Sequence, residues 1–267
     1  MTIVQHRAPN STIVPAGPRD IPLGRITSTE LRKMLDTRSG FWTMASIALA
    51  SLATTGLVIL FADREDLTYR TFTAAISVPM SLILPIIAIL SVTAEWSQRS
   101  GLTTFTLVPH RSRVIVGKLV ASVGIALVAT PVAFAIGAVG NIAGAAVAGV
   151  EPVWDLTTAN LLTIELANVL GMLVGFMLGV VVRSSSAALV AYLLYQFLLP
   201  TLALILAAKQ NWFRELQPWV DFDFATGALL EGPLSSQQWA HLAATGLVWL
   251  VVPLAVGLRL VVRAEVK

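Results

Sequence analysis

Long apolar runs dominate the chain, and six of them are long enough to cross a membrane as helices. Such a helix needs about 20 mostly apolar residues. The runs lie at residues 41–62, 71–92, 114–140, 159–182, 187–208 and 239–262. This pattern predicts an all-α polytopic membrane protein with six transmembrane helices in residues 41–267.

The third run is unusual because it stays apolar as far as Val150. Residues 114–150 are too many for one span of a hydrocarbon core about 30 Å thick. We expect the chain to leave the membrane near residues 137–144. Two separate spans in this region would give seven helices and would place the termini on opposite sides of the membrane.

The basic residues decide between six and seven spans, because Lys and Arg favour the cytoplasmic side. With six spans and both termini inside, 14 of the 18 basic residues lie in inner segments. The exceptions are Arg64, Arg70, Lys209 and Arg214. We therefore predict a multi-pass protein of the plasma (inner) membrane with cytoplasmic N and C termini.

Composition agrees with a membrane location and argues against catalysis by the chain alone. Only 12% of the residues are charged, against about 25% in soluble domains. The sequence contains no cysteine, no phosphate-binding loop, no dinucleotide fingerprint and no H-E-x-x-H zinc motif. We expect no catalytic residue, no bound metal, no directly bound cofactor and no nucleic-acid partner.

Two segments before the first span differ from the rest. The first 24 residues hold Pro9, Pro15, Pro18 and Pro22, and residues 1–24 are predicted to be a disordered cytoplasmic tail. Residues 25–40 predict an amphipathic helix, in which Thr27 would be the N-cap and Glu30 would complete a capping box. Such a helix lies at the inner membrane interface. An ordinary juxtamembrane anchor is the simplest alternative.

The second and third runs are separated by the polar segment EWSQRSGLTTFTLVPHRSR at residues 95–113. In the six-span topology it is the longest cytoplasmic loop. Residues 102–108 could form about two helical turns, which Pro109 would end. A short rigid helix between two spans could transmit a push from a soluble partner into the membrane. The alternative is a plain, positively charged inner loop.

The fourth run contains one acidic residue and a regular glycine pattern. Burying a carboxylate in lipid is costly, so Glu165 should face protein or water. It is either a hydrogen-bonded group near the outer headgroups or part of a substrate path. Gly171, Gly175 and Gly179 are four residues apart, which predicts a face for close helix packing.

Several motifs together resemble the ABC-2-type permeases of ABC transporters. The segment at 95–113 with Gly117-Lys118 is similar to their loop E-(Y/W)-x-x-G-T…T…(T/S)-P-x-R-x-x…K, and TELRK at 29–33 with TRS at 37–39 is similar to their connecting helix. The C-terminal residues 249–267 are similar to the ends of small actinobacterial members. The resemblance covers residues 25–267. The departures are Arg99-Ser100-Gly101-Leu102, where Gly-Thr is usual, and the missing outer domain of some relatives.

The resemblance implies an exporter subunit that pairs with a second permease copy, as a homodimer, and with two ATPase subunits that bind ATP and Mg. It implies a dimer interface on the first and fifth spans. It assigns to the connecting helix Glu30, Arg32, Lys33 and Arg38. It assigns to the coupling loop Glu95, Arg99, Thr103, Thr104, Pro109 and Arg111.

Two other hypotheses remain open at this point. A membrane-embedded enzyme could use Glu165, and would need a second polar group at the same depth, for which Asn141 is the nearest candidate. A membrane anchor or sensor could recruit an ATPase without moving anything. The sequence does not identify a cargo, although apolar spans favour an amphipathic or hydrophobic compound.

Overall fold

The computed structural model describes residues 22–36, 38–97 and 111–263. The described residues form helices and contain no β-strand, only a single isolated bridge between Thr68 and Val153. Six helices are long and apolar enough to cross a membrane. The predicted fold class, an all-α protein with six membrane-spanning helices, is therefore confirmed.

The helices follow the chain in a simple order. The short α1 (Leu23–Asp36) precedes four spans that are each a single helix. The fifth and sixth spans each contain a short π-helical insertion. The first four spans are α2 (Arg38–Phe61), α3 (Tyr69–Ser97), α5 (Arg111–Ala148) and α6 (Thr158–Val182). The fifth comprises α7 (Ser185–Leu193), η2 (Leu194–Leu198) and α8 (Leu199–Lys209), and the sixth comprises α11 (Ser236–Gly246), η3 (Leu247–Val251) and α12 (Val252–Arg263).

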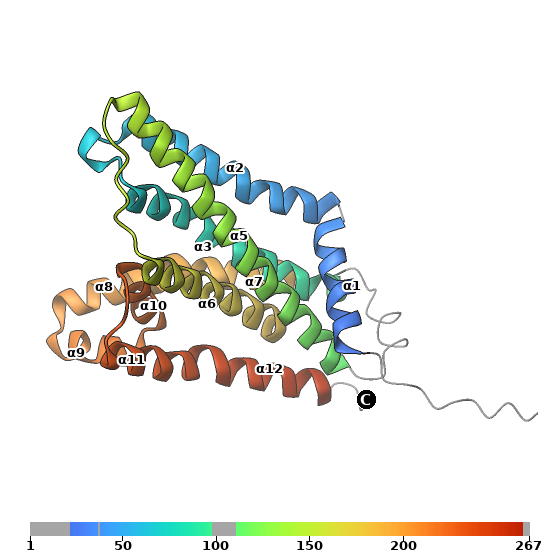
Figure 1. The fold of residues 1–267 in the computed structure, drawn as a ribbon. Helices are drawn as coiled ribbons and strands as arrows, with labels where there is room; N and C mark the ends of the chain where they lie inside the picture. The colour runs from blue at the N-terminus through green and yellow to red at the C-terminus, as the bar shows by residue number, and fades with distance from the viewer. Residues whose placement is uncertain (1–21, 37, 98–110, 264–267) are drawn as a thin grey trace, which may run out of the picture.

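The two ends of the bundle differ. At one end, called the α1 end here, α1 runs across the ends of the spans, and α12 finishes nearby (Figure 1). At the opposite, far end lie the 3₁₀ turn η1 (Arg64–Asp66), the segment joining α5 to α6, and two short helices, α9 (Asn211–Val220) and α10 (Phe222–Glu231). Phe222, Ala225 and Leu229 of α10 are buried in one cluster with Val174 and Tyr192.

The start of α1 differs from the sequence prediction. The helix begins at Leu23, so Thr27 lies within it and is not the N-cap, and residues 23–24 do not belong to the tail. Pro22 precedes the helix, and its carbonyl oxygen accepts from the backbone N–H groups of Arg25 and Ile26. Ile26 is buried above Gly117, where an added Cβ would lie 2.8 Å from Ile26 Cγ2. Packing against α5 therefore places the start of this helix about one turn earlier than the predicted capping box at Thr27 and Glu30.

The helix α5 is longer than the third apolar run. It continues without a break through residues 137–144, where the sequence predicts an exit from the membrane, and ends at Ala148 after 38 residues. Gly140 and Gly144 are positions of close packing, because added Cβ atoms would lie 2.4 Å from Thr55 Cγ2 and 3.0 Å from Phe72 Cζ. A helix of this length spans about 57 Å, and it runs obliquely to α6 and α12 (Figure 1).

The glycines of α6 pack against α3 of the same chain. An added Cβ at Gly175 would lie 2.4 Å from the carbonyl oxygen of Pro85, and one at Gly179 would lie 3.4 Å from Ile89 Cα. Gly171 has more room, with Pro85 Cγ 3.9 Å from its added Cβ. The central pair of the bundle is therefore α3 and α6, and the partner of the glycine face is internal.

Candidate functional site

A buried ion pair joins α1 to α5 at the α1 end. Lys118 Nζ lies 2.5 Å from Glu30 Oε2, and Lys33 Nζ lies 2.7 Å from Glu30 Oε1. Glu30 is 4% exposed and Lys118 is 6% exposed. Burial alone would raise the pKa of the Glu30 carboxyl, but the charges and hydrogen bonds of Lys118 and Lys33 outweigh burial and hold that pKa below its ordinary value. Glu30 is thus an ionised carboxylate inside the helix contact.

The surroundings of this pair make the contact between the helices specific. Leu31 and Met34 of α1 pack against the core cluster that includes Ile47 and Ile115. Burying two charges costs several kcal/mol for each ion, and only close pairing offsets that cost. Sliding or rotating α1 along α5 would separate the charges within an apolar contact. The two helices should therefore move together.

The structure describes only part of the sequence-predicted coupling residues. Glu30 lies in the contact with α5, whereas Arg32 and Lys33 are on the exposed side of α1. Arg38, Glu95 and Arg111 lie in α2, α3 and α5, but their side chains are outside the described part of the structure. Four further residues are outside the described ranges: Arg99, Thr103, Thr104 and Pro109.

Sequence reasoning did not pair Glu30 with Lys118. The two residues are 88 positions apart, which is too far for a local pattern to connect them. The available signal was that each residue belongs to one of the two motifs of the family resemblance. The structure brings these two motifs into direct contact.

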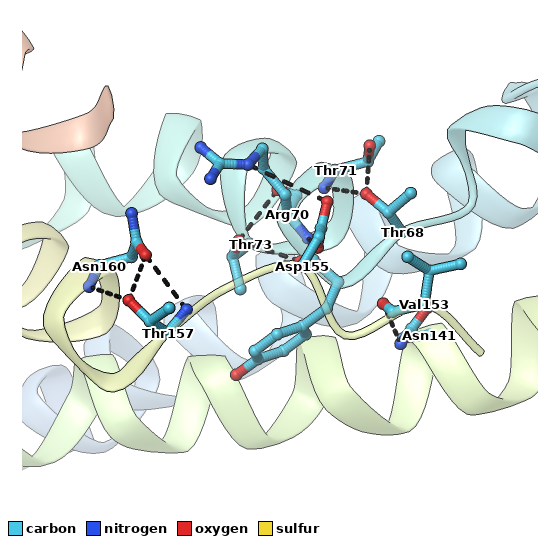
Figure 2. A network of polar contacts seen from close by, with 10 residues as sticks. Thr68, Arg70, Thr71, Thr73, Asn141, Val153, Asp155, Thr157 and Asn160 are labelled. Atoms are coloured by element: carbon cyan, nitrogen blue, oxygen red, sulfur yellow. Dashed lines mark hydrogen bonds and ion pairs between the residues drawn. The ribbon is translucent and has the colours of Figure 1, made fainter. Parts of the chain in front are cut away.

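At the far end, the segment between α5 and α6 crosses the start of α3 and is held there by several hydrogen bonds (Figure 2). The backbone N–H of Tyr69 donates to the carbonyl oxygen of Val153 at 3.0 Å, and Asn141 Nδ2 donates to the same oxygen at 3.0 Å. The backbone N–H of Arg70 donates to Asp155 Oδ1 at 2.8 Å. The position of α3 is thereby linked to the C-terminal end of α5.

A cavity of about 330 Å³ lies between α3, α6, η2 and α10, and is called the polar cavity here. The Tyr192 hydroxyl donates to the carbonyl oxygen of Ser81 and lies 3.0 Å from Gln196 Oε1. Gln196 belongs to the π-helical η2, and such insertions are frequent at functional sites. Other polar residues that line the cavity are Arg70, Thr73, Ser77, Asn168, Asp223 and Thr226.

Glu165 does not line the polar cavity, although its helix neighbours Ile164 and Asn168 do. Its Oε1 atom is buried and has no hydrogen-bond partner in the described part of the chain. Asn141 is engaged with Val153, as described above. Asn141, the candidate partner for acid–base chemistry, thus forms no hydrogen bond with Glu165 Oε1.

Comparisons with models of protein families and with curated proteins find no match to this chain. Within the described residues, no three His, Cys, Asp or Glu side chains lie together in a way that could hold a metal ion. The functional assignment below therefore depends on the geometry of the bundle and on the sequence resemblance.

Proposed function

We propose that the chain is the transmembrane permease subunit of an ATP-binding cassette exporter. It forms the translocation path and is driven by a separate ATPase that engages the α1 end. The observation that carries this proposal is the buried Glu30–Lys118 pair, at 2.5 Å. This pair fixes the amphipathic helix α1 to α5, the span that follows the polar segment 95–113. The two regions expected to contact the ATPase, α1 and segment 95–113, would therefore both act on α5.

A continuous series of contacts leads from the α1 end of the bundle to the polar cavity. A displacement of α1 or of segment 95–113 is delivered to the start of α5. Because α5 is a single helix to Ala148, it carries the displacement to the far end. There Asn141 and Val153 connect it to the start of α3, and α3 forms one wall of the polar cavity. Motion at the α1 end can thus change the cavity.

The spans that are poorly covered within the chain favour a second copy of the chain as a partner. Only 6% of the most apolar window of the fifth span is buried within the chain, compared with 50% for the fourth span. The first and sixth spans are each 22% buried, and the sequence resemblance favours the first of these two. We propose a homodimer through the first and fifth spans, with lipid covering the remaining apolar surface.

The location and partners follow from this assignment. The α1 end and both termini face the cytoplasm, and the protein resides in the plasma (inner) membrane. Two ATPase subunits bind ATP and Mg and supply the energy. The far end, with α9 and α10, faces outward. The permease itself has no catalytic residue.

The test is a double alanine variant in the coupling segment, Glu95→Ala with Arg99→Ala, expressed with an affinity tag in the native host of the chain. Loss of charges from a docking surface should weaken ATPase binding about 30-fold or more. Co-purification of the ATPase and ATP hydrolysis by the complex in nanodiscs are the measurements.

The matched control removes one acid and one base from the far end, Arg214→Ala with Glu215→Ala, where both side chains are exposed. This variant should assemble and hydrolyse ATP as the wild type does. Unchanged assembly and turnover in the Glu95/Arg99 variant would contradict the coupling role. If the ATPase binds but its turnover responds to no compound, the anchor or sensor function replaces the exporter.

A further inference from the structure

A second cavity adjoins the polar one and has the opposite character. It measures about 310 Å³ and is called the apolar cavity here. Its walls come from η2, α8, α9, the start of α10 and η3 and are mainly hydrophobic, including Leu199, Leu202, Leu206, Phe213 and Trp249. Tyr195, Phe222 and Asp223 line both cavities. Asp223 therefore lies at the boundary between a polar and an apolar space.

The two aspartates at this boundary differ in their partners. Asp221 is occupied, because its Oδ1 accepts from the backbone N–H of Phe224 at 3.1 Å and its Oδ2 accepts from Gln217 Nε2 at 3.0 Å. The carboxylate of Asp223 makes no hydrogen bond or ion pair with any residue that the structure describes. Burial, together with the charge of Asp221, raises the pKa of Asp223 to about 6. A cation beside Asp223 would relieve both effects.

Aromatic rings continue from the polar cavity to the apolar one. The ring centroids of Tyr192 and Tyr195 are 6.3 Å apart, and those of Tyr195 and Trp249 are 6.4 Å apart. Trp249 is held in place, since its Nε1 donates to the carbonyl oxygen of Val220 at 2.7 Å. Aromatic faces next to a carboxylate are the usual surroundings of a bound organic ammonium group.

We propose that the two cavities form one binding site for a hydrophobic amine, with the ammonium group at Asp223 and the apolar body against Leu202, Leu206 and Trp249. This site rests on the proposed function and names the cargo class of the exporter. Each cavity falls at the lower end of the volumes of small-molecule sites, which run from about 300 to 1,000 Å³. A ligand that extends through both would therefore have ordinary dimensions.

Arg70 is the cationic residue that lines the polar cavity, and its charge bears on whether the ligand is a cation or an anion. Its Nε lies 4.0 Å from Asp155 Oδ2, and its backbone N–H donates to the same carboxylate. The positive charge of Arg70 is thus partly offset by Asp155, whereas the negative charge of Asp223 has no counterpart among the described residues. The balance favours a cationic ligand over an anionic one.

The test is equilibrium binding of radiolabelled benzyldimethyldecylammonium to the purified full chain in nanodiscs, without an ATPase. The wild type should bind it saturably. Asp223→Asn keeps the shape and removes the charge, and should weaken binding about 10- to 100-fold, as expected when a bound cation loses its partly buried counter-charge. Glu215→Gln removes an exposed acid from the neighbouring α9 and should leave the affinity unchanged.

Further variants keep the result independent of folding. Asp223→Glu should retain binding, and Leu202→Trp should reduce binding by filling the apolar cavity while the charge stays in place. Equal affinity of the wild type and Asp223→Asn, or equal affinity for the anionic analogue decylbenzenesulfonate, would overturn the site. Because this assay contains no ATPase, its failure is distinct from failure of the proposed function. In the assembled complex, stimulation of ATP hydrolysis by the same amine supports the cargo class, and binding without stimulation overturns it.

Discussion

Replacing Lys118 by alanine should destabilise the folded chain by about 3 kcal/mol, at the lower end of the range for breaking a buried ion pair. The variant leaves the carboxylate of Glu30 buried in the contact between α1 and α5, where Lys33 is its one remaining ion-pair partner among the described residues. Thermal unfolding of the purified protein in detergent, followed by light scattering, measures the change.

The matched control is Lys33→Ala, because Lys33 binds the same carboxylate from an exposed position. Its side chain is 50% exposed, and pairs of this kind contribute only about 0–1 kcal/mol. The double variant Glu30→Met with Lys118→Met removes both charges and should recover most of the stability lost in Lys118→Ala. Equal losses in Lys118→Ala and Lys33→Ala would contradict the buried pair.

The same pair predicts the direction of a pH effect. The pKa of Glu30 is lowered in the folded state, so its ionised form contributes stability that is present at neutral pH. This contribution is lost as the pH falls from the ordinary carboxyl pKa through the lowered value. The Met–Met double variant should lack this acid-induced loss, and an identical acid profile in both proteins would argue against an ionised Glu30.

Gly175→Ala should be the most damaging single-methyl addition on the glycine face of α6. The added Cβ would lie 2.4 Å from the carbonyl oxygen of Pro85 and 2.7 Å from its Cα. Backbone atoms cannot rotate away, so α3 and α6 must separate, and overpacking of a core typically costs about 1–3 kcal/mol. We expect a loss at the upper end of this range, measured by thermal unfolding.

Gly171→Ala provides the control on the same helix face. Its added Cβ would make an ordinary contact at 3.9 Å with Pro85 Cγ, so the melting temperature should change little. If the two alanine variants unfold at the same temperature, the close approach of α6 to Pro85 is wrong.

The sequence predicted the spans well because span formation depends on local information. Length and hydropathy within one run decide whether a helix can cross a membrane. Glycine spacing likewise predicted that one face of α6 packs closely, since small residues four apart align on one side of a helix. It could not show whether the partner was α3 or a second copy, because the spacing describes only one of the two surfaces.

Features that depend on distant residues were not predictable in the same way. Glu30 has the sequence context of a capping box, but its partner Lys118 is 88 residues away. The glycines near the end of α5 face Thr55 and Phe72 of other spans, and nothing within the apolar run specifies these neighbours. In both cases the packing partner comes from a distant part of the sequence.

The cavities and the role of Asp223 were also beyond sequence reasoning. The polar residues of the cavity come from five separate elements, and apart from Arg70 and Asp223 each alone resembles an ordinary hydroxyl or amide in a helix. The stretch 219–224 combines aromatic and acidic residues, which is the only local hint. Its meaning depends on how α10 packs against α6 and η2, and no periodicity within the segment specifies that.

The central claim is that a nucleotide-driven motor engages the chain at the α1 end, and photo-crosslinking tests it most directly. The photoreactive residue p-benzoylphenylalanine would replace Thr104 in the coupling segment or, as a control at the far end, Glu231. After irradiation of native membranes, the substitution at Thr104 should yield a covalent adduct with an ABC ATPase, identified by mass spectrometry, and the substitution at Glu231 should not. An adduct with the ATPase at Glu231 only, or no nucleotide-binding protein crosslinked at Thr104, would contradict the account.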